Sequence, residues 1–322
     1  MMIRLAVTCM WLVAAMVSAV QAQDYPARPV RIVVSFPPGG NTDIVARLLA
    51  EQLGRQWGRS VLVENRAGAG GTVGIDYAAK APADGYTLAL ATLGTNATAP
   101  SVYPKLPYDP VRDFAYIAPL AFTPNVLVVN PKMPVRNLAE FIAHARANKG
   151  KLTYSSPGVG LSNHLAMELF LRQAGIDALH VPYKGAAPAT AAAVAGEVDM
   201  SFDAVSTSNG PVRAGTLRAL AVSARSRAAM MPDVPTFAEA GVANVEAYTW
   251  TGLAAPTGTP REIITRLHRD VTAVMKLPEM RERLAGMGAE TIDMSPDEFQ
   301  AFIRTEAQKW GDIARRVGAK ME

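Results

Sequence analysis

The chain contains 322 residues, of which 49% are hydrophobic and 19% are charged. This is the composition of a globular protein, which excludes a disordered or fibrous chain, and the length allows two domains of ordinary size. The formal net charge is only +4, and no basic run accompanies it. We therefore expect no nucleic-acid-binding surface.

The first 22 residues have the pattern of an export signal. Arg4 precedes an apolar stretch, and small residues stand before and at Ala22, where a signal peptidase would cut. We expect cleavage after Ala22 and a mature chain that begins at Gln23. The alternative is an uncleaved membrane anchor, for which the apolar stretch is short. The only cysteine, Cys9, lies inside this segment, so a mature chain would form no disulfide. Together these features predict a periplasmic protein.

The rest of the chain alternates strand and helix patterns. Runs rich in β-branched residues predict strands at 30–36, 61–63 and 86–92, and apolar spacing predicts helices at 44–53 and 73–80. A second series predicts strands at 126–130, 152–156, 179–182, 199–203 and 217–222, with helices at 137–148, 163–174 and 188–195. Asn137 and Glu140 resemble a capping box at the start of one of these helices. From Pro260 the pattern is helical, at 261–276, 278–287 and 296–316.

This alternation predicts an α/β protein with a mostly parallel sheet covered on both faces. Two extended segments, Phe122–Asn125 and Tyr248–Trp250, separate the two series. We therefore expect two lobes joined by two crossover segments. Residues 23–124 plus 250–322 would form lobe 1, and residues 125–249 would form lobe 2. Linkers made only of loop, with proline, would serve as hinges.

The first candidate binding site is the turn after the first strand, Phe36-Pro37-Pro38-Gly39-Gly40-Asn41-Thr42-Asp43. Its two glycines allow the backbone to approach a ligand closely, and Asn41 or Thr42 is expected to cap the helix that follows. The amides of that first helical turn lie at the positive end of the helix dipole, which suits an anion. Asp43 would compete with the anion or favour the dipole. A plain βα turn without a ligand is the alternative.

A turn of the same design in the second series is Ser156-Pro157-Gly158-Val159-Gly160-Leu161-Ser162-Asn163, with Ser162 or Asn163 as the expected helix cap. Ligands of open α/β sheets bind at the carboxyl ends of strands. One such turn in each lobe could therefore bind the two ends of a small diacid. Neither turn contains Lys or Arg, so we expect an anion bound by amides and hydroxyls.

Polar residues at other strand ends are weaker candidates. Thr92, Thr95 and Asn96 follow the third strand, and Asp203 ends an apolar strand, where a carboxylate needs a partner. Plain turns and structural partners are the alternatives. The sequence contains no G-x-S-x-G, H-E-x-x-H or Walker motif, and His164 with Glu168 would not complete a metal site. We therefore expect no catalysis, no metal and no cofactor.

Several longer motifs extend through the mature chain. They include Tyr25-Pro26, Pro38-Gly39-Gly40 before Asp43, Val63-Glu64-Asn65-Arg66, Ala83-Asp84-Gly85-Tyr86, Val181-Pro182-Tyr183-Lys184-Gly185 and Trp250-Thr251-Gly252-Leu253. In these motifs the chain resembles the Bug family, the extracytoplasmic solute-binding receptors of tripartite tricarboxylate transport systems. The resemblance implies a two-lobed periplasmic binding-protein fold with the ligand cleft between the lobes. The lobes would close on a small carboxylate, which then passes to the membrane subunits of a transporter.

The resemblance also implies roles for particular residues. The turns Phe36–Asp43 and Ser156–Asn163 would contact the carboxylates of the ligand directly or through water, and the Phe202-Asp203 pair extends this role to Asp203. Specificity is expected at Asn41, Thr95, Leu161 and Ser206. Family members bind dicarboxylates, tricarboxylates, acidic amino acids or aromatic acids, and the shared motifs do not choose among them. A receptor that presents its ligand to a sensor protein and a periplasmic hydrolase that uses Ser156 or Ser162 are the alternatives, and we expect a monomer.

Overall fold

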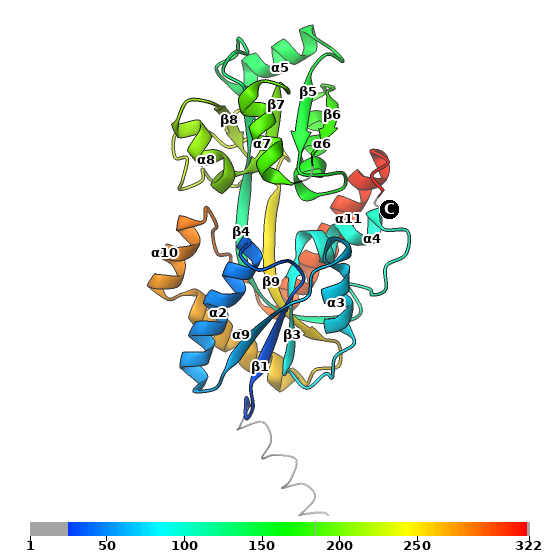
Figure 1. Cartoon of the computed structure of the whole chain (residues 1–322), viewed down its shortest axis with the longest axis vertical. Helices are drawn as coiled ribbons and strands as arrows, with labels where there is room; N and C mark the ends of the chain where they lie inside the picture. The colour runs from blue at the N-terminus through cyan, green and yellow to red at the C-terminus, as the bar shows by residue number, and fades with distance from the viewer. Residues whose placement is uncertain (1–24, 184, 321–322) are drawn as a thin grey trace, which may run out of the picture.

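The computed structural model describes residues 25–183 and 185–320, and the predicted export signal lies outside them. The described chain forms two α/β lobes, one above the other in Figure 1, which share a pair of long strands. This arrangement confirms the two-lobed α/β fold predicted from the sequence. The sheet is mixed and not mostly parallel as expected, because the shared long strands pair antiparallel with their neighbours. No helix in the described ranges is long and apolar enough to span a bilayer.

Lobe 1, the lower lobe in Figure 1, has a parallel sheet built from β1 (Val30–Val34), β2 (Val61–Asn65) and β3 (Thr87–Thr92). Its helices are α2 (Asn41–Trp57), α3 (Thr72–Ala79), α4 (Ala99–Val102), α9 (Arg261–Met275), α10 (Pro278–Gly286) and α11 (Pro296–Arg316), with short turns η1 (Ala69–Gly71) and η2 (Gly94–Thr98). Apolar side chains of α2 and α9 pack on one face of the sheet, and those of α3 and α11 pack on the other. Strand β1 is apolar at every position except Arg31, because both of its faces are covered.

Lobe 2, the upper lobe in Figure 1, has strands β5 (Thr153–Ser156), β6 (Leu179–Pro182), β7 (Met200–Ala204) and β8 (Arg218–Val222). Strand β5 pairs in parallel with β6 and β7. The helices are α5 (Leu138–Ala147), α6 (Ser162–Ala174), α7 (Ala186–Ala195) and α8 (Val205–Arg213). Helix α5 begins as predicted, because the Asn137 side chain accepts a hydrogen bond from the Glu140 amide at 2.9 Å. Helix α8 was not predicted, since it is rich in Ser, Thr, Asn and Gly and contains Pro211, all poor helix formers.

The lobes are joined by β4 (Phe114–Val129) and β9 (Tyr248–Pro256). Strand β4 pairs antiparallel with β9 along its first part and with β7 and β8 along its second part, which gives the order β2-β1-β3-β9-β4-β7-β5-β6 with β8 beside β4. The expectation of loop-only hinges is therefore wrong: Phe122 lies opposite Trp250, and Thr123 opposite Thr249, within a β-ladder. The predicted strand at 126–130 is the second part of β4.

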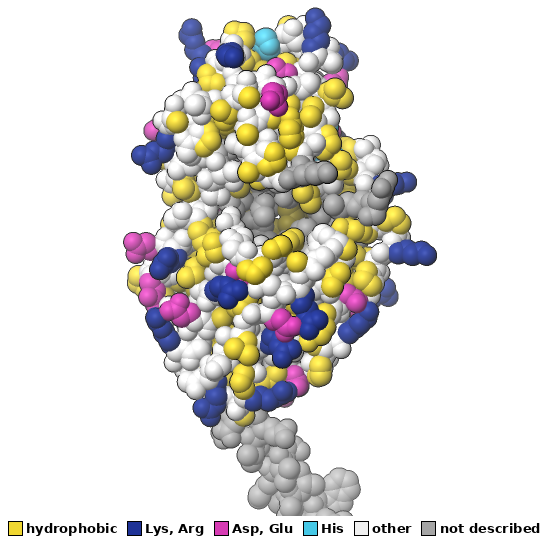
Figure 2. All heavy atoms as spheres, viewed as in Figure 1, with side chains coloured by type: hydrophobic (Ala, Val, Ile, Leu, Met, Phe, Trp, Pro, Cys, Tyr) yellow, Lys and Arg dark blue, Asp and Glu magenta, His cyan; other side chains and the backbone are white. Residues whose placement is uncertain are grey.

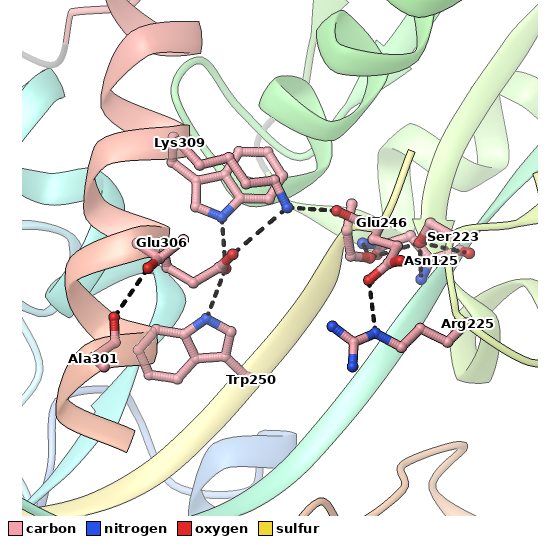
Figure 3. A network of polar contacts seen from close by, with 11 residues as sticks. Asn125, Ser223, Arg225, Glu246, Trp250, Ala301, Glu306 and Lys309 are labelled. Carbon is pink, nitrogen blue, oxygen red and sulfur yellow. Dashed lines mark hydrogen bonds and ion pairs between the residues drawn. The ribbon is translucent and has the colours of Figure 1, made fainter. Parts of the chain in front are cut away.

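On the side where α11 lies, apolar side chains fill the space between the crossover strands β4 and β9 and the helix. One core cluster runs through both lobes and includes Phe122, Trp250, Phe299 and Trp310, whereas the other two clusters each belong to one lobe. A polar network lies within this side (Figure 3): Glu306 Oε2 accepts from the indole nitrogens of Trp250 at 3.2 Å and Trp310 at 2.8 Å. The two lobes are therefore in close contact along α11.

Two further contacts fix the ends of the crossover strands. In Figure 3, Lys309 Nζ of α11 donates to the backbone carbonyl of Glu246 at 2.5 Å, two residues before β9 begins. Ser223 Oγ donates to the carbonyl of Ala247 at 2.6 Å and accepts from the Asn125 amide at 2.9 Å. These bonds connect the segment just before β9 to α11 through Lys309 and to β4 through Ser223.

Candidate functional site

A cavity of about 230 Å³ lies between the lobes, where Figure 2 shows the surface hollowed. The residues around it come from both lobes and from the crossover strands: Asn41, Thr42, Val45, Ala121, Thr123, Ser162, Asn163, Ala186, Asp203, Ala204, Thr207, Thr249, Thr251, Met287 and Ala289. None of these described residues is Lys or Arg. The volume is below the range of drug-sized binding sites and suits a small solute.

Four helices begin at this cavity. Asn41 is the first residue of α2, Ser162 of α6 and Ala186 of α7, while Ala204 is the residue before α8 and Thr207 lies in its first turn. Within the described residues, none of the four helices has a side-chain hydrogen bond that caps its N-terminus. The first amides of a helix have no partner inside the helix and carry the positive end of its dipole. The cavity is therefore suited to an anion.

The predicted helix caps are wrong. The cap positions are Gly40 before α2 and Leu161 before α6, so Asn41 and Ser162 already lie inside their helices. The Asn163 side chain points away from its own first turn and donates to the carbonyl of Phe202 at 3.0 Å. Because these polar side chains do not fold back on the helix ends, the first-turn amides stay available to a ligand.

Asp43 fixes the glycine turn of lobe 1 and does not line the cavity. Its Oδ2 accepts from the Gly39 amide at 2.9 Å and from Arg47 Nε at 2.8 Å, and its Oδ1 accepts from Asn65 Nδ2 at 2.8 Å. The hydrogen bond from Arg47 lowers the pKa of Asp43 to about 2, against the opposing effect of burial. Asp43 is thus an ionised anchor for the turn.

Asp203 lines the cavity and contacts residues of three helices or their starts. Its Oδ2 accepts from Thr190 Oγ1 of α7 at 2.7 Å. Its Oδ1 accepts from the Ala204 amide before α8 at 2.8 Å and from Asn163 Nδ2 of α6 at 3.4 Å. Burial raises the pKa of this carboxyl, and the hydrogen bonds from Thr190 and Ala204 oppose the rise. The structural partners that the sequence left open are therefore present.

Several predicted site residues lie away from the cavity wall. Thr95 and Asn96 are fully buried, and Thr92 is nearly so. Thr95 Oγ1 is 2.9 Å from Thr92 Oγ1, and Asn96 Nδ2 donates to the Tyr116 hydroxyl at 2.8 Å, so these polar groups satisfy one another inside lobe 1. The remaining predicted residues belong to the two turns but not to the cavity lining: Phe36, Pro38, Gly39, Gly40, Ser156, Gly158 and Leu161.

The floor of the cavity was missed by the sequence analysis. In the register of β4 and β9, Thr123 lies opposite Thr249 and Ala121 opposite Thr251. Alternate residues of a strand point to the same face, so these four side chains face the cavity together. Thr251 Oγ1 is buried and has no hydrogen-bond partner among the described residues. The Thr-x-Thr alternation was visible in the sequence, but its pairing with β4 was not.

The hydrolase alternative receives little support from the geometry. Ser156 Oγ lies 2.6 Å from His180 Nε2, which is the spacing of a nucleophile and its base. Ser156 is fully buried, however, and does not line the cavity. Ser162 does line it, and its hydroxyl lies within hydrogen-bond distance of the side chains of Asn163 and Thr249, which are not bases. No group of three His, Cys, Asp or Glu residues in the described part of the chain could bind a metal.

Comparison with known proteins identifies the family. Residues 45–319 match the profile of the tripartite tricarboxylate transporter family receptor. Protein BugT of Bordetella pertussis is 37% identical over 310 residues, which cover 96% of this chain and 95% of BugT. An R. palustris protein solved with adipate shares 37% identity and a TM-score of 0.78, over 92% of this chain and 100% of that one. MatC from Rhodopseudomonas palustris, solved with bound malate, shares 34% sequence identity and a TM-score of 0.74, over 90% of this chain and 99% of MatC. The chain therefore belongs to the receptor family of tripartite tricarboxylate transporters, as its resemblance to the Bug family implied.

Proposed function

We propose that this receptor binds a small dicarboxylate in the cavity between its lobes, in the periplasm, and delivers it to the membrane subunits of a tripartite tricarboxylate transporter. The observation that carries the proposal is the convergence of four helix N-termini on one cavity whose described lining residues include no Lys or Arg. Two similar proteins that bind adipate and malate support the dicarboxylate class.

In this proposal each lobe binds one end of the solute. The first amides of α2 would bind one carboxylate from lobe 1, and those of α6, α7 and α8 would bind the other from lobe 2. The hydroxyls of Thr123, Thr249 and Thr251 would face the middle of the solute from the floor. Residues 25–124 with 250–320 would move as one unit and residues 125–249 as the other. Binding would then require both lobes and would favour their closure.

A ligand screen tests the carboxylate assignment. Thermal shifts are measured with succinate, malate, adipate, citrate and glutamate, and calorimetry follows for the tightest binder. An acid present at 100 times its dissociation constant should stabilise the protein by about 2.7 kcal/mol. Its monoester should bind at least about tenfold more weakly, because a charge-assisted hydrogen bond contributes about 1.5–3 kcal/mol. An ester that binds as tightly as the free acid would refute the assignment.

Proline substitutions test the helix-terminus mechanism. Asn41→Pro and Ser162→Pro each delete one amide at the first position of a helix, where proline is well accommodated. The preceding residues, Gly40 and Leu161, already have extended backbones of the kind found before proline. The matched controls are Asn41→Ala and Ser162→Ala, which change the side chain and keep the amide. Each proline variant should bind the acid about tenfold more weakly than its alanine control. If the proline and alanine variants have equal affinities at both positions, the helix-terminus mechanism is refuted.

A further inference from the structure

Two buried histidines lie beneath the second-lobe turn that leads into α6. His164 is the third residue of α6 and is only 4% exposed, and His180 lies on β6. Their rings stack with centroids 4.0 Å apart and an angle of 9° between planes. The Tyr154 ring of β5 lies nearly parallel to both, with its centroid 4.8 Å from that of His180 and 6.3 Å from that of His164. None of these three side chains lines the cavity.

The histidines contact the turn at both of its ends. The Gly160 amide, which is buried, donates to His164 Nδ1 at 3.0 Å. At the start of the turn, His180 Nε2 lies 2.6 Å from Ser156 Oγ, and the same oxygen accepts from the Gly158 amide at 3.2 Å. The imidazole of His164 thus reaches back from the third position of the helix to an amide that precedes it, as the acidic residue of a capping box does.

The bond to Gly160 requires a neutral imidazole, because an Nδ1 that accepts a hydrogen bond carries no proton. Burial, together with the charge that His180 would carry, lowers the pKa of His164 to about 4. Burial also lowers the pKa of His180 to about 4. The adjoining titratable groups are Tyr154 and Glu168, whose hydrogen bond is 2.5 Å long. At neutral pH His164 is therefore the Nε2–H tautomer.

We propose that His164 is a positioning residue for solute binding: through its bond to the Gly160 amide it fixes the turn 157–161, so that the first amides of α6 face the cavity. His180 fixes the start of the same turn through Ser156. This inference rests on the proposed function of the cavity. A glycine-rich turn has many alternative conformations, and a buried amide left without an acceptor would favour those that reach water.

The test compares two substitutions at one position. His164→Asn places a carboxamide oxygen near the position of Nδ1 and can still accept the Gly160 hydrogen bond. His164→Leu has no acceptor and similar bulk. His144→Leu is the control for loss of a histidine, since His144 lies on α5, at the far end of the upper lobe from the cavity (Figure 1). The measurements are dissociation constants for adipate and malate, the melting temperature, and hydrogen exchange of the Gly160 amide in 15N-glycine-labelled protein without ligand.

We expect His164→Leu to weaken binding of the acid that the wild-type protein prefers by about tenfold or more. Exchange at the Gly160 amide should accelerate by a similar factor, and His164→Asn should recover most of both. His144→Leu should change neither. The inference is overturned if His164→Leu retains the protection of Gly160, or if its affinity stays within twofold of wild type while only its melting temperature falls. If wild-type protein binds neither probe, the proposed function fails for these acids, and Gly160 exchange still decides whether His164 fixes the turn.

Discussion

Gly288 of lobe 1 lies close to residues of lobe 2 at the edge of the cavity. It stands between Met287 and Ala289, which line the cavity, and its φ of +68° is one that favours glycine. A Cβ added there would lie 2.7 Å from Met230 Sδ, 2.9 Å from Val205 Cγ2 and 3.3 Å from the Ser206 nitrogen. The change Gly288→Ala should therefore hinder closure of the lobes.

The size of the effect follows from these distances. Carbon atoms in contact prefer a separation of about 3.5–4.0 Å, so the segment would have to retreat from Val205 by roughly 1 Å. Val205 is fully buried in the core of its own lobe, against which the longer Met230 side chain packs. If the variant reaches the closed state about one time in ten, its apparent dissociation constant rises about tenfold. The positive φ costs about 1 kcal/mol of stability in addition, in any state of the lobes.

A second glycine separates these two effects. Gly318 has a φ of +63°, and an added Cβ there would meet no atom within 4 Å. Gly318→Ala thus carries the backbone strain without the contact. Calorimetry with the tightest-binding acid of the screen should show weakened binding only for Gly288→Ala, while urea unfolding should show a similar loss of stability in both variants. Equal affinities of the two variants would refute the assignment of Gly288 to lobe closure.

Three other substitutions or conditions give further checks. Asp203→Asn turns an amide group toward donors that now bind a carboxylate, and it should lower the free energy of unfolding in urea by about 1–3 kcal/mol; an unchanged value would contradict the role of Asp203 as an anchor of three helices. Glu306→Leu leaves two buried indole N–H donors unpaired and should cost about 2 kcal/mol or more, with Glu306→Gln less damaging; tryptophan fluorescence in denaturant measures both. His164 and His180 titrate near 6.5 when unfolded and near 4 when folded, so the unfolded chain binds more protons between these values. The free energy of unfolding should therefore fall as the pH drops from 6.5 to 4, less steeply in His164→Asn, and a flat profile would count against the buried neutral pair.

Apolar periodicity and helix-start residues predicted the elements that depend mainly on their own sequence. The apolar periodicity and start of α11 placed it correctly, and the structure adds a capping box at Ser295. Helix α8 was not predicted because its residues have low helix propensity. It forms directly after β7 and packs against α7, β4 and β8, which are contacts that a local sequence pattern cannot reveal. The first part of β4 was not predicted, because its partner, β9, lies more than a hundred residues away in the sequence and because Pro119 and Pro124 interrupt the strand pattern.

The candidate site was predicted in outline but not in its details. Glycines after a strand marked the turns of α2 and α6, since such turns follow from chain geometry. The cap prediction failed because Asn163 found hydrogen-bond partners across the fold, in β7 and β4. The polar cluster at Thr95 turned inward for the same kind of reason. The floor threonines depend on the register between two distant strands, which no local pattern specifies.

In the proposed receptor, the groups that attract the anion belong to the main chain of α2, α6, α7 and α8. Every amino acid except proline supplies the same amide, so substitutions in these first turns reshape the cavity and leave the positive helix ends in place. A lineage can thus exchange Asn41 or Thr207 for other side chains and acquire a different acid without passing through a protein that has lost its attraction for anions. Selectivity can drift while anion binding persists, which a site built on a single arginine would not allow.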